Sequence, residues 1–490
     1  MAQAQKNVLI NLLGGAWGGL LIVATTPWFV SRLGLEGFGL IGIWQLLFYL
    51  SLTLDFGLGT SCAREFARSK GLQRSSAHCR RLLALFETPV AAIALLLAIS
   101  VYFGSSWLAH SWLNFKAYEA ADVTLALQVM AISISLQFLA AFYANGLAGL
   151  QELGAMNAVQ MLNNAVKYLG GAAILLAAND IITFFAFQAV AAFASAALAR
   201  FVLMRRIGAD DEPGVHATVG PLHQFARYSA GIFLTSLCGA LLTNADRIAV
   251  SKLMSAEALG RYSVALTAIG ILQMLVIAFH RAYYPRFAQL HAAGLRDQLR
   301  YAYYQACALV GFTVIPVALV VGVFAPQLLY AWIGWSDWDT ALTLRLLVFG
   351  FALSGVMWLP AAYQQATGWT RLHATLMAAT LLTGVPLLPL AIHELGLVGA
   401  SVLMVLHGIL EITLGLWLMN RRCFPGENLK WYRQVIGWPL AISLPVVCIS
   451  RVLMPRDLDR LSSAAWIGAT SVVLLGLIAW WGKQRQARHQ

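Results

Sequence analysis

Apolar runs long enough to cross a lipid bilayer recur along this chain from one end to the other. A bilayer core ~30 Å thick is spanned by about 20 residues of α-helix. The chain has 490 residues, of which 60% are hydrophobic and 11% charged, whereas roughly a quarter of the residues in soluble domains are charged. We therefore expect an all-α polytopic membrane protein.

Charged residues, Pro and Gly divide the apolar sequence into fourteen expected membrane helices. The first six are expected at residues 8–31, 38–61, 82–103, 122–144, 156–178 and 181–204. The other eight are expected at 229–251, 260–282, 303–325, 341–362, 372–393, 397–419, 437–454 and 464–482. The first run is too long for the apolar part of a signal peptide, so we expect it to remain as a membrane helix.

Lys and Arg residues gather in alternate connections between these expected helices. If the N-terminus is cytoplasmic, the basic stretches 64–81 and 281–300 face the cytoplasm, and so do the Arg and Lys residues of 421–433. Cytoplasmic loops of membrane proteins carry an excess of Lys and Arg. The pattern predicts a multi-pass protein with both termini in the cytoplasm.

Two halves of the chain show a weak internal repeat at an offset of 220 residues, from 31 to 251, from 112 to 332 and from 143 to 363. Between them lies RRIGADDEPGVHATVGP at 205–221, whose charges, Pro and Gly are typical of a linker. We expect an N-terminal six-helix lobe at 1–204, a cytoplasmic linker at 205–228 and a C-terminal six-helix lobe at 229–419. Two additional helices and a cytoplasmic tail follow at 420–490. An even helix number predicts lobes of the same orientation, a parallel repeat.

Sequence motifs of catalysis are missing from the chain. It contains no GxxxxGK[ST], GxSxG or HExxH pattern, and its six cysteines are scattered. We therefore expect no catalytic residue, no metal site and no cofactor. The net charge of +12 is spread between apolar runs and forms no basic face with interleaved aromatic residues, so nucleic acid is not an expected partner. A membrane glycosyltransferase or polymerase would need larger outside loops, and transport is what remains.

Three stretches resemble a known family of transporters: TTPWFVSRLGLEGFGL at 25–40, LDFGLG at 54–59 before a basic loop, and NADRIAVSKLMSAEALGRYSVA at 244–265. They are similar to the polysaccharide biosynthesis or oligosaccharide flippases. These are Wzx-type members of the multidrug, oligosaccharidyl-lipid and polysaccharide exporter superfamily. The resemblance covers essentially the whole chain.

This resemblance implies a function in the bacterial cytoplasmic (inner) membrane. It implies that an undecaprenyl-diphosphate-linked oligosaccharide, the repeat unit of O-antigen, capsule or exopolysaccharide, is flipped from the cytoplasmic to the periplasmic leaflet by alternating access. The implied partners are this lipid-linked oligosaccharide and membrane lipid, and contacts with a polysaccharide polymerase or a chain-length regulator stay open. The alternative is a cation-coupled drug or metabolite exporter of the same superfamily, for which twelve helices and a compact acidic pocket would be expected.

A lipid diphosphate needs cations in its transport cavity, preferably bidentate Arg. Lys167, near the middle of an expected helix, is a candidate cavity cation; a structural pairing or snorkelling role is the alternative. Arg64 and Arg281, at expected cytoplasmic helix ends, would meet an arriving diphosphate or serve as ordinary positive-inside anchors. Arg247 is a further candidate; it points about 100° away from its neighbour Asp246 on a helix, so we expect no pair between them.

Ion coupling needs a carboxylate or His that can exchange a cation, and the candidates within expected helices are Asp55, Asp246, His407 and Glu411, with Glu87 as a further carboxylate. His407 lies one turn before Glu411 on the same helix face. The two form either a proton site or a buried structural hydrogen bond. Asp55, in LDFGLG, either couples an ion or orders the helix end beside it.

Overall fold

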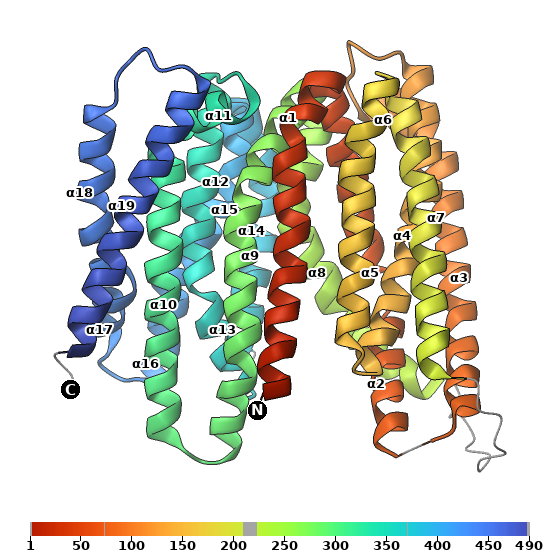
Figure 1. The fold of residues 1–490 in the computed structure, drawn as a ribbon, viewed down its shortest axis with the longest axis horizontal. Helices are drawn as coiled ribbons and strands as arrows, with labels where there is room; N and C mark the ends of the chain where they lie inside the picture. The colour runs from red at the N-terminus through yellow and green to blue at the C-terminus, as the bar shows by residue number, and fades with distance from the viewer. Residues whose placement is uncertain (1, 73, 209–222, 370, 488–490) are drawn as a thin grey trace. The chain divides into compact units, whose positions relative to one another are not determined.

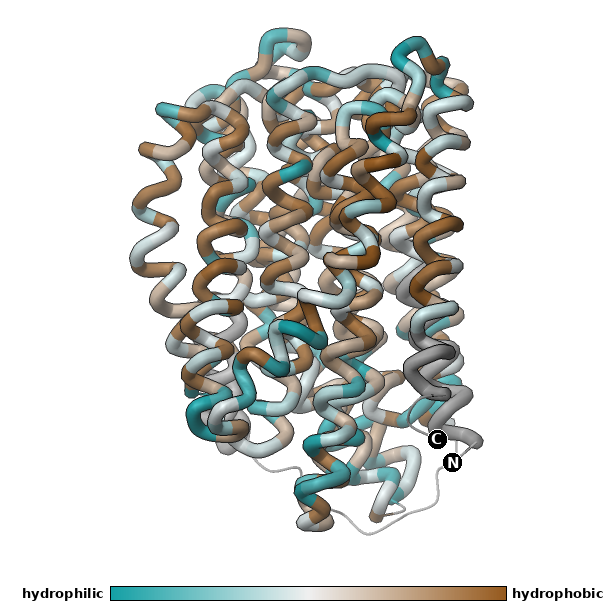
Figure 2. The backbone as a smooth tube through the Cα atoms, turned by 90° about the vertical axis from the view of Figure 1, so that its left-hand side faces the viewer, coloured by the Kyte–Doolittle hydropathy of each residue, from teal (hydrophilic) through white to brown (hydrophobic). Residues whose placement is uncertain are grey.

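The structure, a computed structural model, describes residues 2–72, 74–208, 223–369 and 371–487 (Figure 1). All regular secondary structure in these ranges is helical, which confirms the predicted all-α class. Helices are the expected result in a bilayer, because each helix satisfies its own backbone N–H and C=O groups where water is missing. In Figure 2 long hydrophobic stretches run through the helices, and hydrophilic residues are frequent near their ends.

The chain divides into two compact units, Met1–Gly260 and Arg261–Gln490. The helical elements of the first unit are α1 (Ala2–Thr53), α2 (Leu58–Gly71), α3 (Ser76–Trp107), η1 (Leu108–Trp112), α4 (Ala120–Gly149), α5 (Leu153–Ala165), η2 (Val166–Gly170), α6 (Gly171–Ala177), α7 (Ile181–Ile207) and α8 (His223–Leu253). The elements labelled η are single π-helical turns, which hold one residue more than an α-helical turn.

The second unit continues α9 (Ala256–Ala292), which begins at the end of the first. The helical elements that follow are α10 (Arg296–Val323), α11 (Ala325–Ile333), α12 (Trp338–Val356), α13 (Trp358–Ala366), α14 (Arg371–Leu395), α15 (Leu397–Leu410), η3 (Glu411–Gly415), α16 (Leu416–Cys423), α17 (Asn428–Tyr432), η4 (Arg433–Gly437), α18 (Trp438–Leu453) and α19 (Arg460–Ala487).

Eleven helices among the described residues are long and apolar enough to cross a membrane, so the chain is a multi-pass membrane protein. The expected number of fourteen is not confirmed. α1 contains the expected helix 8–31 and most of 38–61 as two helical segments, which meet at Gly34, where the backbone leaves helical geometry (φ 69°, ψ −179°). The expected helix 156–178 is divided by η2, and 229–251 falls in α8, where many side chains lie outside the described residues.

The expected lobes and the orientation of the chain stay predictions. Residues 209–222, most of the expected linker 205–228, lie outside the described residues, and α7 and α8 supply its two ends. By contacts α8 belongs to the first unit.

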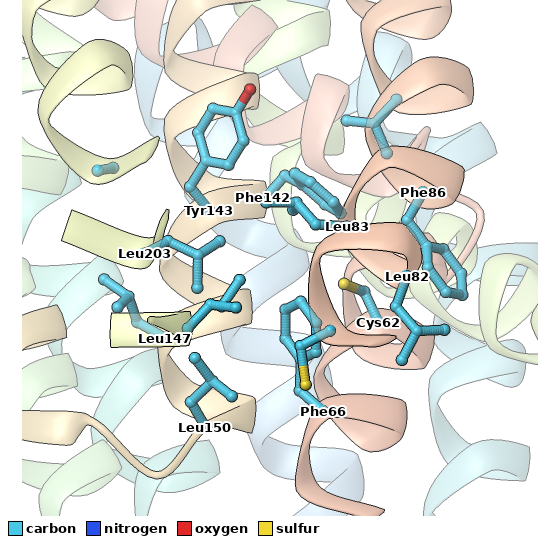
Figure 3. Packing of buried hydrophobic residues seen from close by; sticks show 14 of the residues in the cluster. Cys62, Phe66, Leu82, Leu83, Phe86, Phe142, Tyr143, Leu147, Leu150 and Leu203 are labelled. Atoms are coloured by element: carbon cyan, nitrogen blue, oxygen red, sulfur yellow. The ribbon is translucent and has the colours of Figure 1, made fainter. Parts of the chain in front are cut away.

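The core of the first unit forms where α4 packs between α2, α3 and α7 (Figure 3). Phe66 of α2, Leu83 of α3, Phe142 of α4 and Leu203 of α7 are each 3% exposed or less. Hydrophobic driving force is weak between helices in lipid, so close packing at small residues takes its place. At Gly149 the backbone of α2 lies so near that a Cβ atom would collide with it.

The second unit also packs its helices closely at glycines, where α12 crosses α15. A Cβ atom on Gly408 would lie 2.7 Å from the carbonyl oxygen of Gly350, and one on Gly350 would lie 2.8 Å from the backbone nitrogen of Val405. The two glycines therefore let the helix backbones touch. This close crossing fixes the position of the helical run α15 to α16, which carries His407 and Glu411.

Two glycines of the first unit, Gly39 and Gly260, also meet. A Cβ atom on Gly39 of α1 would lie 2.6 Å from the carbonyl oxygen of Ala256, at the start of α9. A Cβ atom on Gly260 would collide with the carbonyl oxygen of Leu35. Both obstacles are backbone atoms, which cannot turn aside as a side chain can, so α1 and α9 depend on glycine for this contact.

Glu87 forms an ion pair inside the first unit. Arg200 Nε of α7 lies 2.6 Å from Glu87 Oε1 of α3, and the hydroxyl of Tyr143 of α4 donates to the same oxygen at 2.5 Å. Glu87 lies about three turns inside α3, at a depth where an unpaired charge is expensive. The pair joins three helices and gives Glu87 a structural partner that sequence reasoning missed.

We expect Gly260→Ala to destabilise the protein by about 1–3 kcal/mol, because the new methyl group must push two backbones apart. The measurement is thermal unfolding of detergent-purified protein. Gly270→Ala is the matched control in the same helix, since nothing lies within 4 Å of a Cβ atom there. Equal behaviour of the two variants would contradict the close contact.

A double-mutant cycle tests the ion pair of Glu87 and Arg200. We expect Glu87→Gln and Arg200→Gln each to leave a charge unpaired among the helices, and the double variant to recover part of the loss. The coupling energy should be about 0.5–3 kcal/mol, measured by equilibrium unfolding in mixed detergent. Losses that add to within about 0.5 kcal/mol would show that the two side chains do not stabilise each other.

Candidate functional site

Lys167 lies in the π-helical turn η2 of the first unit, held by aromatic rings. Its Nζ atom is 4.1 Å from the ring centroid of Trp44, and the rings of Phe48 and Tyr168 are 5.9 and 5.5 Å away. Nζ also donates to Gln137 Oε1 at 3.4 Å. Among the described residues no carboxylate forms an ion pair with Lys167. Cation–π contacts and one amide thus hold the ammonium group, and its positive charge is not neutralised.

The π-helical turn has a direct consequence for the surroundings of Lys167. Gln188 Nε2 of α7 donates to the Lys167 carbonyl oxygen at 2.9 Å, outside the normal pattern of helix hydrogen bonds. Ser133 Oγ of α4 donates to the Gln188 carbonyl oxygen at 3.3 Å, and Gln137 Nε2 donates to Ser133 Oγ at 3.0 Å. A polar chain through three helices therefore surrounds the cation. π-Helical turns of this kind are frequent at functional sites.

Arg247 of α8 is the second cation with open hydrogen-bonding capacity. Its side chain is 9% exposed, and Nε and Nη1 have no hydrogen-bond acceptor among the described residues. The neighbouring Asp246 is 6% exposed, and its Oδ1 accepts from the Arg247 backbone N–H at 2.7 Å. Burying a charged donor without an acceptor costs free energy. A bound anion or a second conformation of the protein would offset that cost.

Asp55 lines a cavity of about 310 Å³ in the first unit. Its two carboxylate oxygens accept from the Gly59 backbone N–H, both at 3.0 Å. The chain turns sharply here, since Phe56 has φ 48°. Asp55 therefore orders the start of α2, as one interpretation of the sequence held. It also shares the cavity wall with Thr60 and Asn145, which offer further oxygen atoms.

Glu411 of the second unit lies between two histidines. Its side chain is 5% exposed, with Oε2 3.6 Å from His407 Nε2 and Oε1 3.3 Å from His373 Nδ1. His407 Nδ1 lies 3.0 Å from Thr380 Oγ1. The sequence placed His407 and Glu411 on one face because they are one turn apart. His373 was missed, because it lies on α14 and only the fold brings it to Glu411.

Arg64 and Arg281 lie elsewhere. Arg64 is exposed on α2. The expected helix 38–61 is interrupted at residues 54–57, so Arg64 lies on a separate helix. Arg281 is exposed on α9, which continues to Ala292, so Arg281 is not at the helix end that the sequence suggested. Arg281 belongs to the second unit, whereas Arg64, Lys167 and Arg247 belong to the first.

Comparisons with known proteins identify relatives along the whole chain. The sequence pattern of the family described as polysaccharide biosynthesis protein matches residues 4–291, and the MatE pattern matches residues 232–390. A Shigella flexneri protein named "Putative O-antigen transporter" is 23% identical over 437 residues, which cover 86% of this chain and 99% of that protein.

Two solved structures share the fold. An inward-facing multidrug resistance MATE family transporter of the MOP superfamily matches with a TM-score of 0.64 at 16% identity, covering 85% of this chain and 94% of its own. The lipid II flippase MurJ, in an inward closed conformation, matches with a TM-score of 0.60 at 12% identity, covering 97% of this chain and 98% of its own. These likenesses describe a transporter fold. Because its pattern spans more than half of the chain, the chain belongs to the polysaccharide biosynthesis protein family.

Proposed function

We propose that this protein is a flippase for an undecaprenyl-diphosphate-linked oligosaccharide, which it moves from the cytoplasmic to the periplasmic leaflet by alternating access. The observation that carries the proposal is the pair of cations inside the first unit, Lys167 and Arg247. Neither forms an ion pair with a carboxylate among the described residues, and Arg247 has two open donors. A chain of the polysaccharide biosynthesis family that keeps such cations between membrane helices is suited to an anionic lipid substrate.

The chemistry of these cations matches a diphosphate. A guanidinium presents two N–H groups in a fixed fork that fits two phosphate oxygens. An ammonium supplies a compact positive charge that suits a phosphate. The oxygen and nitrogen atoms of Gln137 and Gln188 beside Lys167 can exchange hydrogen bonds with sugar hydroxyls. The substrate would thus supply the acceptors that Arg247 lacks in this conformation.

The comparisons support the same class of substrate. The Shigella flexneri relative is named as an O-antigen transporter, and MurJ is named as a lipid II flippase. O-antigen, capsule and exopolysaccharide repeat units are the glycans that fit the proposal. It places the chain in the bacterial inner membrane with both termini in the cytoplasm, beside a polysaccharide polymerase and a chain-length regulator.

Glu411 with His407 and His373 is the proposed proton-coupling site. A buried carboxylate between two imidazoles can bind a proton on any of the three groups, and their joint charge depends on the pH at the accessible side. η3 begins at Glu411, so the helix geometry is already irregular there. Asp55 in its cavity and Asp246 beside Arg247 are the remaining candidates for ion coupling.

The second candidate function is a cation-coupled drug or metabolite exporter. The observation in its favour is the MatE match over residues 232–390, the part of the chain that contains Glu411's partner His373. The likeness to MATE transporters covers 85% of this chain. A cationic drug would be repelled by Lys167 and Arg247, which favours the anionic lipid.

Replacing either internal cation should impair flipping. In a host that lacks this protein, we expect Lys167→Gln and Arg247→Gln to restore transport about tenfold less well than wild type, a loss of ~1.4 kcal/mol in transition-state or substrate binding. The measurement is the leaflet distribution of lipid-diphosphate-linked oligosaccharide. Lys116→Gln, in an exposed loop, is the control. Normal arrival of the oligosaccharide in the outer leaflet without the protein would refute the flippase proposal.

Removing the titratable carboxylate should uncouple transport from a proton gradient. In proteoliposomes with an imposed pH gradient, we expect wild type to flip a fluorescent lipid diphosphate faster than without the gradient, and Glu411→Gln to lose that response. Glu394→Gln is the matched control, because Glu394 also pairs with a histidine but is exposed. A Glu411→Gln protein that still responds to the gradient would exclude this carboxylate from coupling.

A further inference from the structure

Three arginines surround a hollow in the second unit that the proposed transport does not use. The hollow has a volume of about 440 Å³ and lies between the start of α14 and the end of α16. Its walls also contain a tryptophan and the apolar parts of both helices. The lining residues are Trp369, Arg371, Leu372, Thr375, Leu418, Arg421 and Arg422.

The guanidinium groups are positioned by aromatic rings. Arg422 Cζ lies 4.5 Å from the ring centroid of Trp369, and Arg421 Cζ lies 5.5 Å from that of Trp417. Stacking on a ring fixes the plane of a guanidinium but uses only its face. The N–H groups at its edge remain available for an acceptor.

Among the residues that the structure describes, no acidic side chain lines the hollow, so its three positive charges are not balanced by a lining carboxylate there. Two other basic residues of the second unit have a carboxylate partner. Arg300 and Lys430 both form ion pairs with Glu427. Among the described residues Arg371, Arg421 and Arg422 form no ion pair. Three neighbouring guanidiniums repel one another, and an anion between them would remove that repulsion.

The surroundings of the hollow are those of a lipid-facing surface. Trp417 is 45% exposed one turn before Arg421, and Leu414, in η3, is 42% exposed. On α14, Leu382 is 74% exposed three turns beyond Arg371. Charged residues at a helix end with exposed apolar residues beyond them are typical of the membrane–water interface. A ligand with a charged head and apolar chains fits this surface better than a soluble anion does.

From these contacts we propose that the hollow binds the phosphate groups of an anionic lipid head group. The three arginines suit a head group with two phosphates, because two or more negative charges nearly balance them. Two kinds of lipid have this chemistry. One is a phospholipid with two phosphates, such as diphosphatidylglycerol, and the other is a polyprenyl diphosphate, which would load here only if the proposed flippase function holds.

Native mass spectrometry of the purified full-length protein tests the site. The protein is titrated separately with phosphatidylethanolamine, diphosphatidylglycerol and undecaprenyl diphosphate. We expect Arg371→Gln/Arg421→Gln/Arg422→Gln to weaken binding of at least one two-phosphate lipid by about tenfold or more, and to leave phosphatidylethanolamine binding unchanged. The lipid that loses affinity identifies the source of the head group.

A matched control separates the site from total charge. Arg286→Gln/Arg296→Gln/Arg433→Gln removes the same charge from exposed positions of the second unit and should keep the wild-type affinity. If the triple variant of the hollow is not recovered as a folded protein, Arg421→Gln/Arg422→Gln replaces it with the same criterion. Unchanged affinity in the hollow variant, or an equal loss in the control, overturns the proposal. No step of this test measures transport, so its failure is distinct from failure of the flippase function.

Discussion

The hydrocarbon interior of a bilayer offers no partner to a charge. Every ionised group among these helices is therefore costly unless the protein or a bound ligand supplies a partner. Glu87 and Arg200 neutralise each other, and Glu411 lies between two histidines. Lys167 has only aromatic faces and an amide, and Arg247 has donors without acceptors. The pair of Glu87 and Arg200 holds helices together, whereas the open groups of Lys167 and Arg247 are the ones that we propose for a substrate.

The fold class follows from the sequence because a bilayer imposes one rule on every residue that it contains. Apolar length alone predicts helices, and all regular structure in the described ranges is helical. The number of helices is less predictable, because it depends on local backbone geometry. The break at Gly34 falls between the expected helices 8–31 and 38–61, where Arg32 and Glu36 interrupt the apolar sequence, whereas η2 interrupts a helix without a Pro. The π-helical turn leaves no trace in the hydropathy of the sequence.

Candidate charges were predictable one by one, whereas their partners mostly were not. His407 and Glu411 are four residues apart, so helix periodicity places them together. Arg200 and Glu87 are separated by 113 positions, and His373 lies on a different helix from Glu411. Such pairs depend on which helices pack side by side, and backbone contact at glycines such as Gly350 and Gly408 decides that.

Lys167 and Glu411 share one local feature, since each lies in a π-helical turn. A π-helical turn accommodates one additional residue within a continuous helix. The residues that follow it are therefore rotated by about 100° relative to an uninterrupted α-helix. Each turn has the geometry that the insertion of a single residue into an α-helix produces. Relatives that lack the insertion would present a different face of the same helix, and a gap of one residue, placed inside the helix, would align them correctly.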